Sequence, residues 1–243
     1  MLLTDEINRL QEIIGSCRSL VFFGGAGVST ESGIPDFRSA DGLYNQKYRF
    51  PPETILSHTF FTRHTEEFYE FYRDKMLCLS ARPNKAHLFL AELEKSGKLG
   101  AVVTQNIDGL HQLAGCKRVY ELHGSVHRNY CQKCGKSFDA EFILNSSGVP
   151  KCTDCGGIIK PDVVLYEEPL DDRTVIASVN AIANADVLIV AGTSLTVYPA
   201  AGLTRYFNGK SLVLINKSAT QLDSKADLVI YESVGETLSQ IKI

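Results

Sequence analysis

Seven short strand-like segments limit the fold of this chain more than any other feature of its sequence. Several of them are continuously apolar, which is typical of strands in a parallel sheet covered on both faces. Apolar residues at helical spacing supply the crossovers between strands. We therefore predict an α/β fold with a doubly wound parallel sheet. The strand segments are Ser19–Phe23, Gly100–Thr104, Val119–Leu122, Asp162–Tyr166, Asp186–Ala191, Ser211–Ile215 and Asp227–Tyr231, and helical spacing is found in Leu2–Ile14, Asn84–Lys95, Asp171–Ala185 and Pro199–Phe207.

Two stretches do not fit this pattern and predict a second, smaller domain. Residues 40–81 are rich in aromatic side chains at helical spacing, so we expect an inserted helical module. Residues 128–159 contain two closely spaced cysteine pairs. The sheet domain is then discontinuous and is expected to comprise residues 1–39, 82–127 and 160–243.

Composition excludes several classes of protein. Charged residues make up 22% of the chain and the formal net charge is −3, which argues against broad attraction to nucleic acid or anionic membrane. The N-terminal residues lack the basic start and apolar core of a secretion signal, and no run approaches the roughly 18 apolar residues of a membrane span. We expect a cytoplasmic protein without disulfides, and without nucleic-acid or membrane partners.

The most specific local pattern is a pair of Cys-x-x-Cys motifs. Cys131 and Cys134 are separated by 17 residues from Cys152 and Cys155, a spacing at which two tight turns present four thiolates to one tetrahedral Zn²⁺. Redox motifs or coincidence are the alternatives. Four sulfur ligands leave no open position, so the zinc is expected to be structural. The lysines and acids around the cysteines balance, which does not favour nucleic-acid binding.

A glycine-rich turn follows the first predicted strand. Backbone N–H groups in Gly24–Ser29 can approach a pyrophosphate closely, although such turns also serve only to reverse the chain. A hydride-transfer enzyme needs an acidic residue at a strand end about twenty positions later to bind the ribose. Asp41 is near that distance but does not end a strand, so a dehydrogenase is disfavoured.

Polar side chains follow two further strands. Thr104–Asp108 comes directly after one strand and Glu121–Gly124 after the next, at the sheet edge where open α/β proteins bind ligands. A single histidine is more often structural than catalytic. At a strand end, however, His123 is placed to act as a base on a ribose hydroxyl.

The ordered set of motifs resembles the sirtuin family over about residues 20–234. The matching segments are Gly25–Ser29, Gly33–Arg38, Thr104–Asp108, His123–Gly124, the four cysteines, Gly192–Leu195 and Ile215–Asn216. The resemblance implies a Rossmann-like domain, with a small domain made of the helical module and a zinc ribbon. It also implies NAD-dependent removal of acetyl or other acyl groups from protein lysines, with NAD consumed as a co-substrate.

The resemblance also implies roles for individual residues. His123, Asn106 and Asp108 would be catalytic, with His123 drawing a proton from the ribose so that the 2′-oxygen attacks the imidate formed by the acyl group. Nicotinamide, free lysine and O-acetyl-ADP-ribose would be released. Further cofactor contacts would come from Ala26, Thr30 and Arg38 at the phosphates and ribose, Phe37 and Ile107 with Asp108 at nicotinamide, Gln105 with Asn106 at the ribose, Thr193 and Ser194 at the phosphate and adenosine, Asn216 at the adenosine ribose, and Ser233–Val234 at adenine.

Three positions depart from the family pattern. Glu167 stands where sirtuins usually have glycine, Lys160 replaces an arginine, and Gly24 replaces a threonine. In the family, an acetylated peptide lies as an added strand between the segments that correspond to Val163–Glu167 and Leu195–Val197. Glu167 is therefore expected either to narrow the approach of the peptide or to favour basic residues in it.

Three functions from different classes are compatible with these residues: a protein-lysine deacylase, a sirtuin-like ADP-ribosyltransferase, and a non-catalytic NAD-sensing or zinc-ribbon binding module. An intact His123 with Asn106 and Asp108 favours the first. Sirtuins that prefer acidic acyl groups carry a Tyr-x-x-Arg pair in the helical module. Here Tyr69 is followed at that spacing by Tyr72, so we predict a preference for acetyl over succinyl groups.

Overall fold

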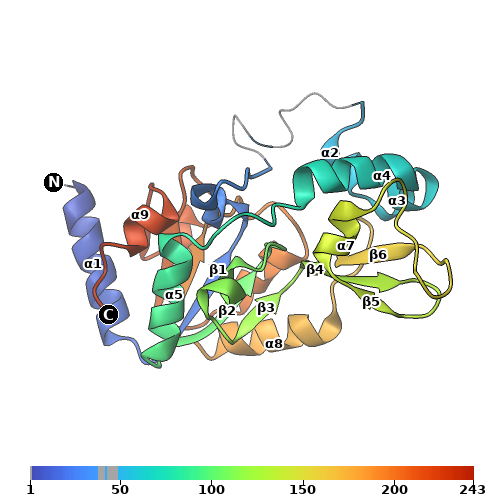
Figure 1. The fold of residues 1–243 in the computed structure, drawn as a ribbon. Helices are drawn as coiled ribbons and strands as arrows, with labels where there is room; N and C mark the ends of the chain where they lie inside the picture. The colour runs from blue at the N-terminus through green and yellow to red at the C-terminus, as the bar shows by residue number, and fades with distance from the viewer. Residues whose placement is uncertain (1, 38–41, 43–48) are drawn as a thin grey trace.

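The computed structural model describes residues 2–37, 42 and 49–243, and within these ranges no helix is long and apolar enough to cross a membrane. A parallel sheet of six strands forms the larger domain, in the order β3-β2-β1-β7-β8-β9 (Figure 1). In chain order this is the 3-2-1-4-5-6 arrangement of dinucleotide-binding folds. The strands are β1 (Leu20–Gly24), β2 (Leu99–Thr104), β3 (Val119–Glu121), β7 (Val187–Ala191), β8 (Ser211–Ile215) and β9 (Leu228–Ile230).

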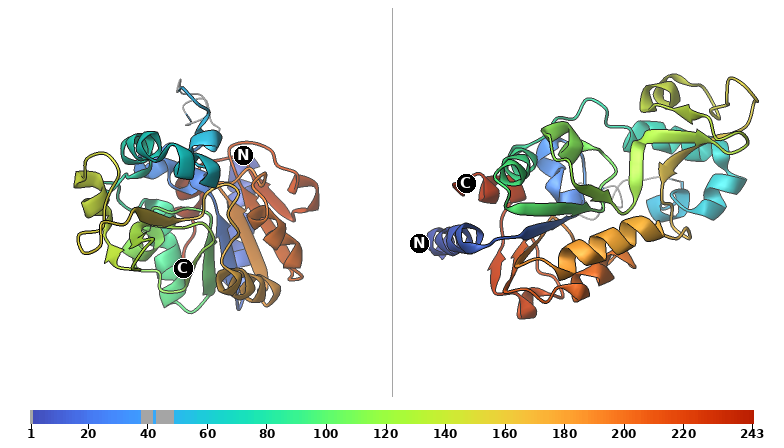
Figure 2. Two further views of the ribbon diagram at one scale, coloured as in Figure 1. Left: turned by 90° about the vertical axis from the view of Figure 1, so that its right-hand side faces the viewer. Right: turned by 90° about the horizontal axis from the view of Figure 1, so that it is seen from below.

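Helices cover both faces of this sheet, which explains the continuously apolar strands (Figures 1 and 2). Along β1, Leu20 and Phe22 belong to one core cluster, whereas Val21 and Phe23 belong to another. The first cluster includes residues of α1 (Leu2–Ser16), α5 (Lys85–Lys95) and α9 (Val234–Leu238). The second includes residues of α8 (Asp172–Ala183) and the 3₁₀ helix η5 (Ala200–Tyr206), which replaces the regular helix expected at Pro199–Phe207.

A second sheet and a group of short helices form the smaller domain, which lies on the right in Figure 1. Its three strands are arranged antiparallel in the order β5-β4-β6. A separate core cluster packs these strands against the helical module. The elements are α2 (Pro52–Ile55), α3 (His58–Arg63), α4 (Thr65–Phe71), the π-helical turn η4 (Tyr72–Met76), β4 (Gly124–Cys131), β5 (Ser137–Phe138), α7 (Ala140–Asn145) and β6 (Ile159–Val163).

The prediction that Asp162–Tyr166 forms a strand of the large sheet is wrong. The strand is β6, which pairs with β4 in the small sheet. Its side chains alternate between buried and half-buried, unlike those of the large sheet, because only one face of β6 packs on a core. The expected domain boundaries at residues 127 and 160 consequently fall inside β4 and β6.

The remaining short elements connect the strands and carry loops at the carboxyl edge of the large sheet. The 3₁₀ turns η1 (Ala26–Val28) and η2 (Thr30–Ser32) follow β1, and α6 (Leu110–Ala114) follows the segment after β2. A further 3₁₀ turn, η6 (Asp223–Lys225), precedes β9. The strand order reverses between β1 and β7, so the loops after these two strands border the crevice in which such folds bind ligands.

Candidate active site

Two glycine-containing loops pack directly on each other at the point where the strand order reverses. The Gly27 amide donates to the carbonyl oxygen of Gly192 at 2.8 Å. A Cβ atom on Gly27 would lie 2.8 Å from the Cα atom of Gly192, and one on Gly25 would lie 2.7 Å from the Cβ atom of Thr193. No side chain fits between the loops, so the backbone itself lines this end of the crevice.

A buried serine joins two of the predicted catalytic residues. The hydroxyl of Ser29 donates to Oδ2 of Asp108 at 2.6 Å and accepts a hydrogen bond from Nδ2 of Asn106 at 2.9 Å. The other oxygen of Asp108 accepts the backbone amide of Leu110 at 2.9 Å. Ser29 is only 1% exposed. One buried hydroxyl therefore links the loop after β1 to the loop after β2.

Ser29 was missed as a functional residue in the sequence, although it closes the glycine-rich motif. Its two partners lie 77 and 79 residues away, so no local spacing indicated the contact. The only available signal was the presence of a small polar residue at the end of a glycine turn that faces a polar strand end.

His123 lies at the same edge of the sheet, after β3. Thr104 at the end of β2 pairs with Glu121 at the end of β3. Nδ1 of His123 lies 2.9 Å from the carbonyl oxygen of Gln105. A carbonyl only accepts, so Nδ1 carries the proton and, in the neutral ring, Nε2 is left with its lone pair. Burial lowers the pKa of His123, against a smaller opposing effect of this hydrogen bond. The neutral, basic form is thus favoured.

A chain of polar contacts lies where the adenosine part of NAD is expected to bind. Nε2 of Gln105 donates to Oγ1 of Thr193 at 3.0 Å, and the Thr193 amide donates to Oδ1 of Asn216 at 2.9 Å. Nδ2 of Asn216 is buried and has no partner among the described residues. An unsatisfied buried donor is costly unless a ligand completes it, and a ribose hydroxyl is a suitable acceptor. The residues therefore fit a dinucleotide.

The other predicted contacts are distributed around these loops. Thr30 donates its hydroxyl to the Gly27 carbonyl, and half-buried Phe37 and Ile107 pack against the core of the small domain. Ser194 is exposed and its hydroxyl lies 2.8 Å from that of Thr196. The side chain of Val234 is buried in the core of the large domain, so only its backbone is available to a ligand. Arg38 and the half-buried Ala26 complete the predicted set, but Arg38 lies outside the described residues.

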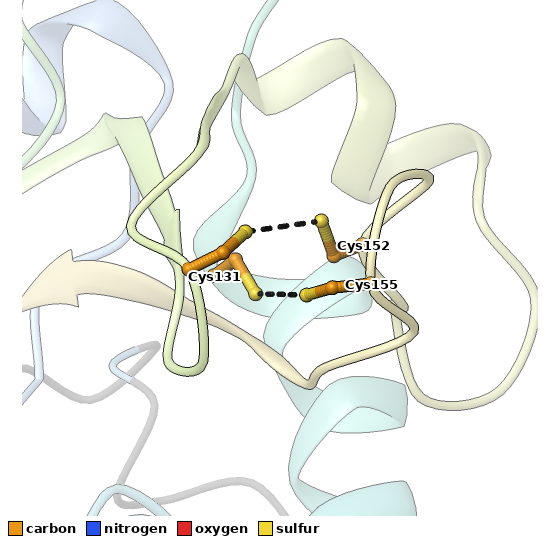
Figure 3. A group of neighbouring side chains, drawn as sticks. Cys131, Cys152 and Cys155 are labelled. Carbon is orange, nitrogen blue, oxygen red and sulfur yellow. Dashed lines mark hydrogen bonds between the residues drawn. The ribbon is translucent and has the colours of Figure 1, made fainter.

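The four cysteines of the small domain converge as predicted (Figure 3). Their sulfur atoms all lie within 4.8 Å of one another. Each pair has the same turn, in which the amides of Gly135 and Gly156 donate to the carbonyls of Cys131 and Cys152. Both glycines have positive φ, 74° and 67°, which the turn requires. Four thiol groups at this separation suit tetrahedral Zn²⁺, with no position left for water.

Comparison with known proteins agrees with this geometry. The chain is 64% identical to an NAD-dependent protein deacetylase of Clostridium acetobutylicum, over 99% of this chain and all of that protein. It is 63% identical to another of the same name from Clostridium perfringens, over 98% of each chain.

Solved structures extend the likeness to three dimensions. A Sir2 structure with a deacetylated p53 peptide and 3′-O-acetyl ADP ribose has a TM-score of 0.89 at 39% identity and covers 96% of both chains. A Sir2 structure with p53 peptide and NAD⁺ has a TM-score of 0.85 at 40% identity, over 96% of this chain and 95% of that one. The model of the Sir2 family matches residues 25–199. This chain belongs to the Sir2 family.

Proposed function

We propose that this protein is an NAD-dependent protein-lysine deacetylase that acts in the cytoplasm. The observation that carries the proposal is the cluster at the carboxyl edge of the large sheet, where Ser29 links Asn106 to Asp108 beside a neutral His123. The relatives named as deacetylases, which match nearly the whole chain, support the same reaction. The products are nicotinamide, free lysine and O-acetyl-ADP-ribose.

His123 acts as the general base. Its Nδ1–H is committed to the Gln105 carbonyl, so Nε2 takes the proton from a ribose hydroxyl of NAD. Burial keeps the ring neutral and ready to accept that proton. The Gln105 carbonyl also fixes the ring orientation, and it stabilises the imidazolium that forms when the proton is taken.

Asp108 and Asn106 hold the leaving-group end of NAD. Hydrogen bonds from Ser29 and the Leu110 amide orient the Asp108 carboxylate, which contributes negative charge where positive charge develops at the ribose as nicotinamide departs. Asn106 is 8% exposed; its side chain is fixed by Ser29, and its backbone amide donates a hydrogen bond to the hydroxyl of Thr104. Fixed dipoles in a water-poor pocket stabilise this charge more than bulk water does.

The acetylated peptide lies as an added strand between Val163–Glu167 and Leu195–Val197. Two Sir2 structures that contain p53 peptide support a peptide substrate for this site. The four cysteines bind one structural Zn²⁺, which organises the small domain that holds one side of the peptide and supplies no catalytic group.

The proposal is tested by incubating the protein with an acetyl-lysine peptide and NAD that carries a label in its adenine ring. Deacetylation requires the label to leave as O-acetyl-ADP-ribose, in equal amounts with free lysine and nicotinamide. Label retained on protein would instead identify an ADP-ribosyltransferase. Saturable NAD binding without nicotinamide release would identify a non-catalytic sensor.

A further inference from the structure

Glu167 adopts a backbone conformation that side chains rarely occupy. Its φ is 77°, in the left-handed region that favours glycine. This conformation accounts for the glycine usual at this position in sirtuins. A glutamate is retained in such a conformation only when other contacts of the residue compensate for the strain.

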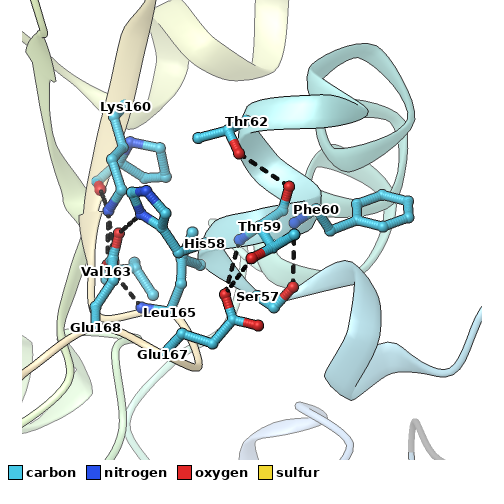
Figure 4. Close-up of polar contacts among 11 residues, drawn as sticks. Ser57, His58, Thr59, Phe60, Thr62, Lys160, Val163, Leu165, Glu167 and Glu168 are labelled. Carbon is cyan, nitrogen blue, oxygen red and sulfur yellow. Dashed lines mark hydrogen bonds and ion pairs between the residues drawn. The ribbon is translucent and has the colours of Figure 1, made fainter.

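The compensating contacts come from the helical module, not from the large domain. One carboxylate oxygen of Glu167 accepts both the backbone amide of Thr59 at 2.9 Å and its hydroxyl at 2.7 Å (Figure 4). Thr59 is the second residue of α3, whose first amides have no partner within the helix. A carboxylate is favoured there by the helix dipole. These hydrogen bonds also hold the pKa of Glu167 below its usual value.

The residues on either side of Glu167 are tied to the same helix. Tyr166 forms a parallel bridge with Ser57, and its carbonyl accepts the amide of His58 at 3.0 Å. Glu168 contacts Nδ1 of His58 at 2.9 Å and Nζ of Lys160 at 3.0 Å. Lys160, which stands where the family usually has arginine, thus forms an ion pair with Glu168. The whole turn after β6 is anchored to the start of α3.

We infer that Glu167 is a positioning residue for the acyl-peptide, because its carboxylate fixes the segment Val163–Glu167 to the small domain. The inference rests on the proposed deacetylase function and on the peptide strand described above. Because the carboxylate is turned toward α3 in Figure 4, we expect it to act through this contact, and not by narrowing the approach of the peptide or by selecting basic residues in it. NAD is held by loops of the large domain, and its binding does not depend on this contact.

Three substitutions separate positioning of the peptide from relief of backbone strain. Glu167→Ala keeps a Cβ at positive φ without the hydrogen bonds, so both thermal stability and peptide affinity fall. Glu167→Gly relieves the strain and regains stability, but the peptide KM stays raised because the anchor is absent. Glu167→Gln keeps an oxygen acceptor for Thr59 and restores the peptide KM. We expect the peptide KM to rise about fivefold in Glu167→Ala and Glu167→Gly, the size of effect expected when charge-assisted hydrogen bonds at a helix terminus are lost. The NAD KM should stay within about twofold of the wild-type value.

The partner and the control are tested in the same assay. Thr59→Val removes one of the two bonds and is expected to raise the peptide KM in the wild type but not in Glu167→Gly. Glu70→Ala removes an exposed glutamate from α4 and is expected to leave both KM values unchanged.

An unchanged peptide KM in Glu167→Gly would overturn the inference. So would a Glu167→Gln variant that changes the ratio of KM values for peptides with lysine or glutamate beside the acetyl-lysine, since that would indicate selection by charge. Absence of deacetylation by the wild type would instead contradict the proposed function. In that case direct measurement of peptide binding by fluorescence anisotropy still tests the anchor.

Discussion

The two domains of this protein are organised by different physical means. In the large domain, strands β1 and β7 are buried along their whole length, and two apolar clusters fill the space on either side of the sheet. In the small domain, β6 alternates in burial and β4 mixes buried and exposed residues around one cluster, and the cysteine turns and polar contacts complete the structure. We assign the chemistry to loops of the large domain and propose that the small domain positions the substrate. We therefore expect activity and stability to be separable in the large domain and coupled in the small one.

The largest effect is expected for His123→Ala, which tests the large domain. Loss of a general base lowers turnover by about 10²–10⁴-fold. NAD affinity should stay within about tenfold of the wild type, because the base acts on hydroxyls after NAD is seated. Melting temperature should change little by comparison, since the ring makes one hydrogen bond to the protein and is not part of an apolar cluster. Steady-state rates, calorimetric NAD binding and thermal unfolding measure the three quantities. Turnover near that of the wild type would remove His123 from its role.

Loss of the metal site tests the small domain. Cys131→Ala should abolish binding of one Zn²⁺ per chain and lower stability by several kcal/mol, because metal binding contributes directly to folding of such modules. Activity should fall with it. Cys116→Ala is the matched control, since Cys116 is equally buried but belongs to the core of the large domain. Elemental analysis that finds no zinc in protein purified without chelators would contradict this expectation.

Local sequence patterns predicted the features that depend on neighbouring residues. The doubly wound sheet was confirmed, because continuous apolar strands have few alternatives to burial on both faces. The cysteines converge because each pair sits on a turn that its own glycine makes possible. Asn106, Asp108 and His123 lie at one edge, because carboxyl ends of parallel strands share an edge.

Features that depend on distant partners were not predictable. The apolar pattern of residues 162–166 indicated a strand but not the sheet to which it belongs. Ser29 and Glu167 owe their roles to hydrogen bonds with residues far along the chain, and no spacing rule reports such contacts. The roles assigned to Thr193, Ser194 and Val234 as NAD contacts stay predictions, as does the division into domains.

Acid should weaken the large domain through two histidines behind the active-site loops. His87 and His111 are almost fully buried, with ring centroids 4.7 Å apart. Burial lowers the pKa of His87 to about 4, and burial followed by the neighbouring His87 lowers that of His111 well below its usual value. Both pKa values are lower in the folded chain than in the unfolded chain. The free energy of unfolding is therefore highest above about pH 6.5, where both histidines are neutral in either state. It decreases as pH falls below that value, because the histidines then gain protons more readily in the unfolded chain.

Between pH 7 and pH 5 the free energy of unfolding should fall by about 2 kcal/mol per histidine, because the unfolded chain takes up protons that the folded chain does not. Urea unfolding at the two pH values measures it. His111→Phe should make the free energy of unfolding less dependent on pH. His64→Phe, at an exposed histidine, is the control for loss of an imidazole. An unaltered pH dependence in His111→Phe would show that the pair does not limit acid stability.

The smallest effect concerns the choice of acyl group, for which Arg73 is the decisive residue. Its guanidinium donates to the Gly148 carbonyl at 2.7 Å and to the Ser146 hydroxyl at 3.3 Å, and it lies over the ring of Tyr69. Arg73 therefore joins the helical module to the segment before the second cysteine pair. Tyr69 is itself buried, with its hydroxyl bonded to the Ile159 carbonyl. With these contacts in place, neither side chain is available to an acyl carboxylate.

A buried succinyl carboxylate without a cationic partner is strongly disfavoured. We expect kcat/KM for an acetyl-lysine peptide to exceed that for the matched succinyl peptide by at least about tenfold, or roughly 1.4 kcal/mol in the transition state. Arg73→Met should lower stability but leave this ratio unchanged, because Arg73 connects two parts of the small domain and does not contact the substrate. Equal rates on the two peptides, or a succinyl preference that Arg73→Met abolishes, would mean that Arg73 leaves its contacts with Ser146 and Gly148 to bind the acyl group. The small domain would then select the acyl group chemically as well as position the peptide.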